Sequence, residues 1–96
     1  MKNKIYFNKI FIRDNNLNLY ERFTYMNLAI DLGREKERFV TQEGLANTVG
    51  VCIPTVRKSL RSLKAKGYID YTLDTIPSKG RGYTYRIIRY EYMIGD

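Results

Sequence analysis

Residues 41–69 decide the fold of this chain, and they read TQEGLANTVGVCIPTVRKSLRSLKAKGYI. The first part of the stretch predicts a short helix over Gln42–Val49. Thr41 stands at its N-cap position, where a side-chain oxygen accepts a hydrogen bond from an unpaired backbone N–H. Gly50 follows the helix and adopts the left-handed conformation without steric cost, so we expect a tight turn through Val51.

A second helix follows this turn, and we expect it to run from Ile53 to Lys66. Cys52 occupies its N-cap position. Pro54 is tolerated in the first turn, because the N–H groups there have no partner within the helix. Gly67 ends the helix. Two helices joined by a tight turn therefore form the centre of the predicted fold.

The two sides of this second helix differ in chemistry when its residues are placed at about 100° intervals. An apolar stripe faces the core and consists of Val56, Ser59, Leu60 and Leu63. The opposite side contains no acidic residue and carries Pro54, Lys58, Arg61 and Ala65, flanked by Thr55 and Arg57. Amphipathic helices are common at protein surfaces, so this pattern gains its meaning from the helix before it and the hairpin after it.

Two strand-like runs come next, Tyr68–Leu73 and Tyr83–Ile88. Both are rich in β-branched and aromatic residues and alternate with a period of two, as strands do. The loop between them is rich in turn residues, and both charged residues at its tip, Lys79 and Arg81, are basic. We therefore expect a β-hairpin with a basic tip.

Another helix is predicted upstream, over Leu19–Leu32. Asn18 can cap it while Glu21 reaches back to the cap, which is a capping box, and Gly33 ends it. Spacings of four, three and four residues place one set of apolar side chains on a single face, and Tyr20, Leu28 and Leu32 widen that face; the set is Leu19, Phe23, Met26 and Ile30. Further along, Phe39–Val40 can form a short third strand. The predicted fold class is α+β, mostly α, in a single domain over residues 1–96.

The two ends of the chain are less regular. Lys4–Ile12 is apolar but fits neither period, so it can be a strand, a short helix or an arm within an N-terminal segment over residues 1–16. Tyr90–Ile94, in a tail over residues 90–96, either continues the last strand or packs against a partner. We expect these two segments to be the surfaces of a homodimer, in which case deleting Lys4–Ile12 changes the sedimentation mass.

The composition excludes several kinds of catalytic site. The chain has 96 residues, 44% of them apolar, with one cysteine and no histidine. It therefore has no imidazole base and no Ser-His-Asp or Cys-His pair, and a single cysteine builds neither an intramolecular disulfide nor a multi-cysteine zinc site. We expect no enzyme activity, no metal and no cofactor. The start of the chain resembles a signal peptide only faintly, and no run is long enough to cross a membrane, so we expect a cytoplasmic protein with no membrane partner.

The net charge of +7 is concentrated in one part of the chain. Between Cys52 and Arg89 only Asp70 and Asp74 are acidic, whereas nine residues are basic: Arg57, Lys58, Arg61, Lys64, Lys66, Lys79, Arg81, Arg86 and Arg89. A basic run is often only a solvated face. Here it coincides with the most regular part of the pattern, which favours a surface that binds a polyanion.

With these residues in place, the chain resembles the winged helix-turn-helix family over about residues 17 to 89. The matching residues are Leu45, Ala46, Gly50, Val51, Thr55, Val56, Leu63, Gly67 and Ile69. The upstream helix is similar to the first helix of winged-helix domains in phage and plasmid replication initiators and in small mobile-element regulators. Cys52 departs from the family pattern, which has serine or threonine there, and a thiol contacts phosphate more weakly.

The resemblance implies that the helix 53–66 enters the major groove of duplex DNA, while the hairpin wing reaches the adjacent minor groove or its phosphates. The planar fork of arginine suits a guanine edge, and free amides at a helix N-terminus suit phosphate. The candidate DNA-binding residues are Thr41, Gln42, Cys52, Pro54, Thr55, Arg57, Lys58, Arg61, Lys79 and Arg81.

Two functions remain open at this point. The first is a double-stranded DNA-binding protein, either a transcriptional regulator or an origin-binding replication initiator, which acts as a homodimer and recruits a replication or transcription protein. The second is a winged helix that docks an acidic partner protein through the same outward face. DNA affinity with a steep salt dependence distinguishes them, because a protein partner alone predicts none.

Several residues also have purely structural interpretations. Lys64 and Lys66 can serve the C-terminal end of their helix, and Arg86 and Arg89 can be ordinary charges on the face of the sheet. The tyrosines of the hairpin are expected to pack across strands rather than to stack on bases; they are Tyr68, Tyr71, Tyr83 and Tyr85.

Overall fold

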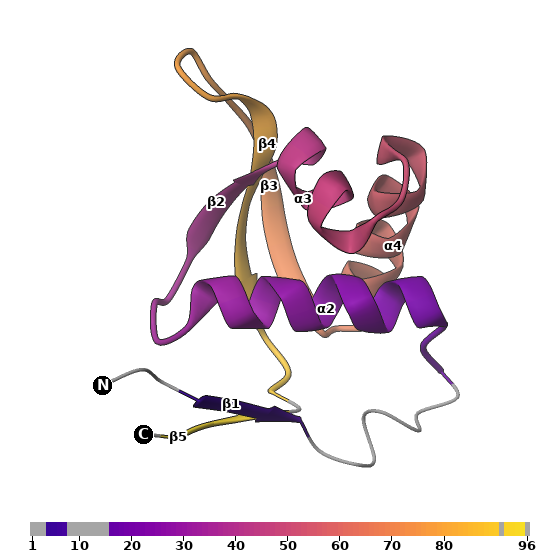
Figure 1. The fold of residues 1–96 in the computed structure, drawn as a ribbon, viewed down its shortest axis with the longest axis vertical. Coiled ribbons are helices and arrows are strands. Elements are labelled where there is room, and N and C mark those ends of the chain that lie inside the picture. Colours follow the sequence, from indigo (N-terminus) through magenta and orange to yellow (C-terminus); the bar gives the residue numbers. More distant parts are fainter. Residues whose placement is uncertain (1–3, 8–15, 91, 96) are drawn as a thin grey trace.

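The structure is a computed structural model that describes residues 4–7, 16–90 and 92–95. Within these residues, three helices and two antiparallel sheets make up the fold (Figure 1). In chain order the elements are β1 (Lys4–Phe7), α2 (Leu19–Leu32), β2 (Arg38–Thr41), α3 (Gln42–Val49), α4 (Ile53–Ala65), β3 (Ile69–Ile76), β4 (Gly80–Ile87) and β5 (Tyr92–Gly95). Within the described residues, no helix combines the length and the hydropathy that spanning a membrane would need.

The helices lie where the sequence predicts them. The capping box of α2 is present: the Glu21 amide donates to Asn18 Oδ1 and the Asn18 amide donates to Glu21 Oε1, both over 2.8 Å. The Thr41 side chain caps α3 by accepting from the Gly44 amide over 3.0 Å. Gly50 has φ +85°, the left-handed conformation that the tight turn requires.

The start and the end of α4 differ slightly from the prediction. The helix ends at Ala65 rather than Lys66, and Gly67 follows with φ +82°. Cys52 occupies the N-cap position, but its side chain makes no capping hydrogen bond. Its Sγ instead lies 3.1 Å from the hydroxyl oxygen of Thr55, because both side chains stand on the first turn of the helix.

The main sheet has the strand order β2-β4-β3, with both pairs antiparallel. The predicted short strand at Phe39–Val40 is part of β2, which pairs with β4 from Arg38↔Tyr85 to Thr41↔Gly82. The hairpin strands extend further into the loop than the sequence pattern predicts, since Ile76 pairs with Gly80. Helices of 14, 8 and 13 residues are thus accompanied by two strands of eight, so helix predominates less than expected.

Gly82 allows β2 and β4 to approach closely. A Cβ atom at this position would lie 2.2 Å from the carbonyl oxygen of Val40 and 2.7 Å from the ring of Phe39. Only glycine fits without a shift of the backbone, so this residue fixes the place where β2 joins the hairpin.

The two ends of the described chain pair with each other. β1 and β5 form a separate two-stranded antiparallel sheet, with Lys4 opposite Gly95 and Phe7 opposite Tyr92. Of the structures considered for Lys4–Ile12, a strand is present over Lys4–Phe7, and residues 8–12 lie outside the described residues. The tail forms its own strand rather than extending β4. Figure 1 shows this small sheet beside α2.

The core lies between α2, α3, α4 and one face of the main sheet. The stripe of α4 predicted to face inward is buried: Val56 0%, Leu60 1%, Leu63 0% and Ser59 4% exposed. Tyr68, Tyr83 and Tyr85 are also buried, which confirms them as packing residues. The hydroxyl of Tyr85 donates to the Leu28 carbonyl over 2.6 Å and so joins the sheet to α2.

The apolar face predicted for α2 is wrong in part. The buried residues of this helix are Glu21, Thr24, Tyr25, Leu28, Ala29 and Leu32. Leu19, Phe23 and Ile30 lie on the opposite side and are 56%, 44% and 54% exposed. The helix carries apolar side chains on two sides, and periodicity does not determine which of them meets the core. The side with Tyr25 meets the core, and the Tyr25 hydroxyl there donates to the Arg89 carbonyl over 2.7 Å, beyond the end of β4.

Candidate nucleic-acid interface

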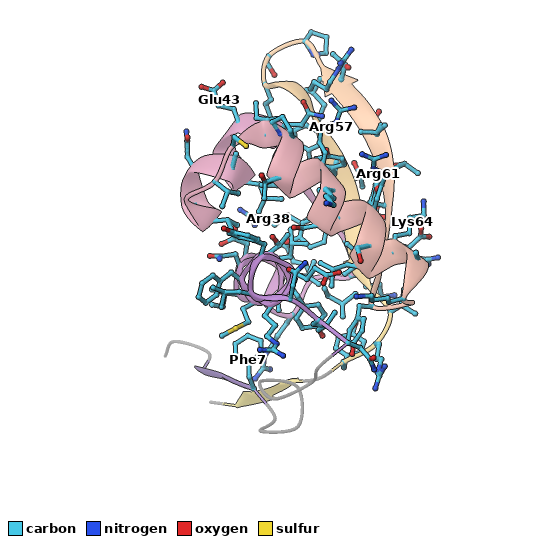
Figure 2. The ribbon with its side chains drawn as sticks, turned by 90° about the vertical axis from the view of Figure 1, so that its right-hand side faces the viewer. Phe7, Arg38, Glu43, Arg57, Arg61 and Lys64 are labelled. Atoms are coloured by element: carbon cyan, nitrogen blue, oxygen red, sulfur yellow. The ribbon has the colours of Figure 1, made fainter. Side chains whose placement is uncertain are left out.

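The outward side of α4 carries exposed cations. Arg57, Lys58 and Arg61 are all exposed, and Figure 2 shows Arg57, Arg61 and Lys64 along one flank of the helix. They are held there because the other side of α4 packs Val56 and Leu60 into the core. An amphipathic helix anchored by one face presents the other face as a nearly rigid row.

These cations have no partner of their own within the described part of the chain. No ion pair or side-chain hydrogen bond engages Arg57, Lys58 or Arg61 among residues 4–7, 16–90 and 92–95. Their charge is therefore available to an external anion, and binding one would break no internal ion pair among those residues.

The two lysines near the end of α4 are used differently. Lys64 Nζ lies 3.3 Å from Asp70 Oδ1, donates to the Tyr71 carbonyl over 3.0 Å and sits 4.7 Å from the centre of the Tyr71 ring. Lys66 Nζ lies 3.1 Å from Glu21 Oε2, and that carboxylate is buried. Both lysines therefore have structural roles that join α4 to β3 and to α2.

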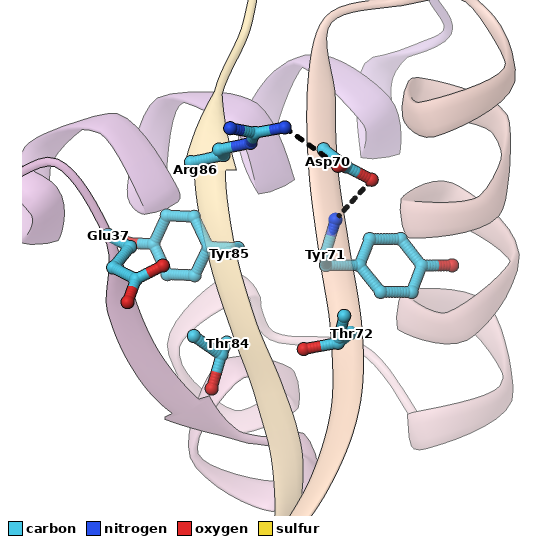
Figure 3. Close-up of a pocket in the computed structure, with 7 residues that line it drawn as sticks. All are labelled: Glu37, Asp70, Tyr71, Thr72, Thr84, Tyr85 and Arg86. Carbon is cyan, nitrogen blue, oxygen red and sulfur yellow. Dashed lines mark hydrogen bonds and ion pairs between the residues drawn. The ribbon is translucent and has the colours of Figure 1, made fainter.

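Arg86 of β4 and Arg89, which follows the end of that strand, are also engaged by the protein itself. Arg86 Nη2 lies 3.3 Å from Asp70 Oδ2, on the face of the sheet that Figure 3 shows turned away from the helices. The hydrogen bond from Lys64, together with the one from Arg86, holds the pKa of Asp70 below its ordinary value. The Arg89 guanidinium lies 4.8 Å from the centre of the Tyr68 ring.

The depression on that outer face does not bring together residues that form a recognisable binding or catalytic site. Its lining contains Asp70 and Arg86, which form an ion pair with each other, and the half-buried residue Tyr71. Glu37, Tyr85 and two threonines, Thr72 and Thr84, complete the lining (Figure 3).

The register of the hairpin brings one wing residue to the α4 side. Side chains alternate along a strand, and Arg81 is two residues from buried Tyr83 and four from Tyr85, so it projects from the same face as the core residues. It pairs with Thr75 across the hairpin. A groove of about 370 Å³ lies there, lined by Gln42, Arg57, Leu73, Asp74, Thr75 and Arg81.

This groove unites three of the candidate residues from separate elements: Gln42 from α3, Arg57 from α4 and Arg81 from β4. Gln42 is oriented by its amide, which donates to the Tyr83 hydroxyl over 3.2 Å. The sequence did not single out Leu73, whose side chain is 64% exposed at this place. The alternation along the strand could have predicted this position, because Leu73 pairs with Tyr83 and therefore projects from the same face of the sheet.

The tip of the wing carries Lys79. This residue is exposed in the three-residue turn, where its amide donates to the Ile76 carbonyl over 2.9 Å. Gly80 follows with φ +97°, so the turn needs glycine at that position.

The first turn of α4 holds the remaining candidates. Cys52 and Pro54 are exposed, and Thr55 is half-buried. The hydrogen bond with the Thr55 hydroxyl lowers the pKa of the Cys52 thiol. Thr55 and Lys58 line a second depression on the other flank of α4, together with Asn18, Tyr20, Glu21, Ser59 and Ser62. Tyr20 and Ser62 are additions to the predicted set, and Ser62 follows from the same helical spacing that places Lys58.

Comparisons with known proteins give a likeness of fold. The sequence matches no protein-family model and none of the curated proteins. Among solved structures, one with a similar fold is a "possible transcriptional regulator" from Methanosarcina mazei Go1, with a TM-score of 0.56 and 19% identity. The match covers 75% of this chain and 57% of that one, so this chain corresponds to little more than half of its neighbour. Three helices with a three-stranded antiparallel sheet are compatible with a winged helix.

Proposed function

We propose that this chain binds double-stranded DNA as a winged-helix protein and acts as a transcriptional regulator. The proposal rests on a difference between two groups of basic side chains. Those on the outward side of α4 and on the wing have no internal partner among the described residues, whereas Lys64, Lys66 and Arg86 are held in ion pairs.

In the proposed complex α4 lies in the major groove. Arg57 and Arg61 lie four residues apart on one flank of the helix, so they reach adjacent base edges or phosphates on one side of the groove. Lys58, on the other flank, neutralises phosphate. Pro54 and Thr55 bring the start of the helix close to the bases because their side chains are small.

The wing supplies a second contact. Arg81 and Arg57 face the same groove of the protein, so DNA seated on α4 brings its backbone past Arg81. Lys79 at the tip then reaches the adjacent minor groove or its phosphates. Thr41 and Gln42, at the start of α3, meet the backbone between these two contacts.

The choice of a regulator over a replication initiator rests on the structural neighbour from Methanosarcina mazei Go1, whose name is that of a regulator. Nothing in the contacts of α4 distinguishes the two roles, since both need sequence-specific binding to a duplex.

A salt titration tests the proposal. Neutralisation of about six phosphates predicts that log affinity falls with log salt concentration at a slope near −5, measured by fluorescence anisotropy with a labelled duplex. Duplexes selected by the protein from a random library serve as the specific ligand. Absence of duplex affinity at about 50 mM salt would overturn the proposal and would favour the docking of an acidic protein on the same face.

A further inference from the structure

We infer that the outer side of α2 is the surface through which two copies of this chain pair. Its residues Leu19, Phe23, Met26 and Ile30, here called the α2 stripe, lie opposite the buried residue Leu28 on the helix. Met26 is half-buried, and the other three are 44 to 56% exposed. This surface differs from the two terminal segments that the sequence predicts as dimer surfaces.

The spacing within the α2 stripe indicates that another helix covers it. Intervals of four, three and four residues are those of alternating d and a positions in a coiled coil, with Leu19 and Met26 at d and Phe23 and Ile30 at a. The core of this protein uses only Met26 of this pattern, which is half-buried and packs against it, because α2 meets the core mainly through the opposite side. Leu19, Phe23 and Ile30 remain exposed. They fit a matching helix, and a second copy supplies one.

The exposed area is large enough for a small symmetric interface. A large apolar side chain that is half exposed leaves on the order of 100 Å² accessible, so the α2 stripe with Tyr20 (48% exposed) presents about 400 Å² per copy. Two copies thus bury about 800 Å² of apolar surface. The polar flanks of α2 add to this total and bring it toward the roughly 1,200 Å² of small specific interfaces.

A parallel pair keeps the like charges beside the α2 stripe apart. Arg22 borders one flank, and Asn27 and Asp31 border the other. A two-fold axis parallel to the helices sets each flank against the opposite flank of the second copy. Like charges therefore do not meet, although the chain as a whole carries +7.

The same axis suits the proposed interface with DNA, and this step rests on the proposed function. Figure 2 looks along α2 end-on from the side on which α4 lies in Figure 1, and α4 with Arg57 and Arg61 lies above and to the right of α2 in this view. The axis of α2 therefore points toward the side on which α4 is exposed. Two copies related by an axis parallel to α2 turn both α4 helices to one side, as two half-sites on a duplex require.

Sedimentation equilibrium of the full chain without DNA tests the pairing by itself. At a chain concentration of about 100 μM, well above a micromolar dissociation constant for the dimer, we expect a mass of twice the 11.4 kDa of one chain. Ile30→Glu places a charge in the α2 stripe and is expected to return the mass to that of one chain. Leu73→Glu is the matched control, because Leu73 is comparably exposed but lies on the hairpin, and it should leave the mass doubled.

A cross-linking experiment tests the parallel arrangement without relying on a destabilising charge. Identical d residues face each other in a parallel pair, so Leu19→Cys in a Cys52→Ser background should form a disulfide-linked dimer under mild oxidation. Asn47→Cys in the same background, exposed on α3, should remain a single chain.

The inference is overturned if the unaltered chain has the mass of one copy at every concentration, or if Ile30→Glu remains dimeric. It is also overturned if Leu19→Cys fails to cross-link. These results are independent of DNA. A dimer that binds no duplex would reject the proposed function and leave the pairing intact, whereas a duplex-binding single chain would do the reverse.

Discussion

At the scale of single residues, the cations divide by whether the protein already holds them. Arg61 and Arg86 illustrate the difference, since both are exposed but only Arg86 has a carboxylate partner, 3.3 Å away. An arginine in an ion pair must give up that partner to bind phosphate, whereas an arginine without one need not. The number of basic residues therefore overstates the charge that this protein offers to an external anion.

Arg61→Ala is expected to weaken binding of a selected duplex by about 1–3 kcal/mol, or roughly 5- to 150-fold in Kd, because it removes a groove or phosphate contact. Fluorescence anisotropy at fixed salt measures the change. Arg86→Ala removes the same charge from the other face of the sheet and is the matched control. Equal losses in the two variants would mean that net charge alone drives binding and that α4 is not the contact.

Glu21 is the one carboxylate among the described core residues, with a side chain 3% exposed. Burial opposes its ionisation, but hydrogen bonds from the Asn18 amide, Ser62 and Lys66 outweigh that cost and hold its pKa below the ordinary value. The folded state thus binds fewer protons than the unfolded chain. The stabilisation by ionised Glu21 is complete above about pH 4.3, the pKa of this group in the unfolded chain. It is lost as the pH falls through the lower pKa of Glu21 in the folded state.

Glu21→Gln should therefore lower the free energy of unfolding at pH 7 by about 1–3 kcal/mol, and the difference from the unaltered chain should shrink below about pH 4. Urea unfolding at both pH values measures this. Glu35→Gln, in the exposed loop after α2, should have little effect at either pH. A difference independent of pH would show that shape, and not charge, accounts for the contribution of Glu21.

At the scale of elements, position in the sheet determines what each strand contributes. β4 lies in the centre and pairs with both β2 and β3. Its inward residues Tyr83, Tyr85 and Ile87 fill the core, and the same alternation carried beyond the core aims Arg81 at the side of α4. The wing is thus a continuation of the core strands, which gives its basic residues a defined direction.

A wing variant tests this contribution. Lys79→Ala with Arg81→Ala should weaken duplex binding and reduce the magnitude of the salt slope by about two, one for each phosphate that is no longer neutralised. Arg34→Ala with Lys36→Ala removes two charges from the loop at the far end of the sheet and should leave the slope nearly unchanged (Figure 1). Equal slopes in both double variants would reject the role of the wing in binding.

The junction of β2 with β4 depends on Gly82. Gly82→Ala should destabilise the fold by about 1–3 kcal/mol, because the new Cβ overlaps the Val40 carbonyl and forces the strands apart. Thermal unfolding followed by circular dichroism measures the loss. Thr72→Ala, an exposed substitution on the same sheet, should change stability by less than about 0.5 kcal/mol.

At the scale of the whole molecule, the basic side chains without internal partners raise the electrostatic energy of the folded state. Added salt screens that repulsion and, in the proposed complex, also competes with DNA for the same surface. The two effects of salt on this protein therefore have opposite signs.

Raising the salt concentration from about 50 to 500 mM should stabilise the free protein by on the order of 1 kcal/mol while abolishing most duplex affinity. Differential scanning calorimetry and anisotropy measure the two effects. The Lys79→Ala, Arg81→Ala variant has less repulsion to screen and should gain less stability. A free protein that loses stability with salt would show that internal ion pairs dominate its electrostatics.

Local sequence patterns predicted the three helices, the side-chain caps of α2 and α3, and the presence of the hairpin. These features depend on local chemistry: the side chain of Asn18 or Thr41 finds amides within the next turn, and Gly50 supplies a conformation that other residues avoid. The inward stripe of α4 was also predictable, because only one side of that helix is apolar. The exposure of Arg57, Lys58 and Arg61 follows from it.

The buried side of α2 depends on tertiary contacts, because apolar residues stand on both sides of this helix. Long-range contacts made the choice: Tyr25 with Arg89, Tyr85 with Leu28 and Glu21 with Lys66. Each joins residues at least 45 positions apart, and no local pattern records such a pairing. The same is true of β1 with β5, which brings the two ends of the chain into one small sheet.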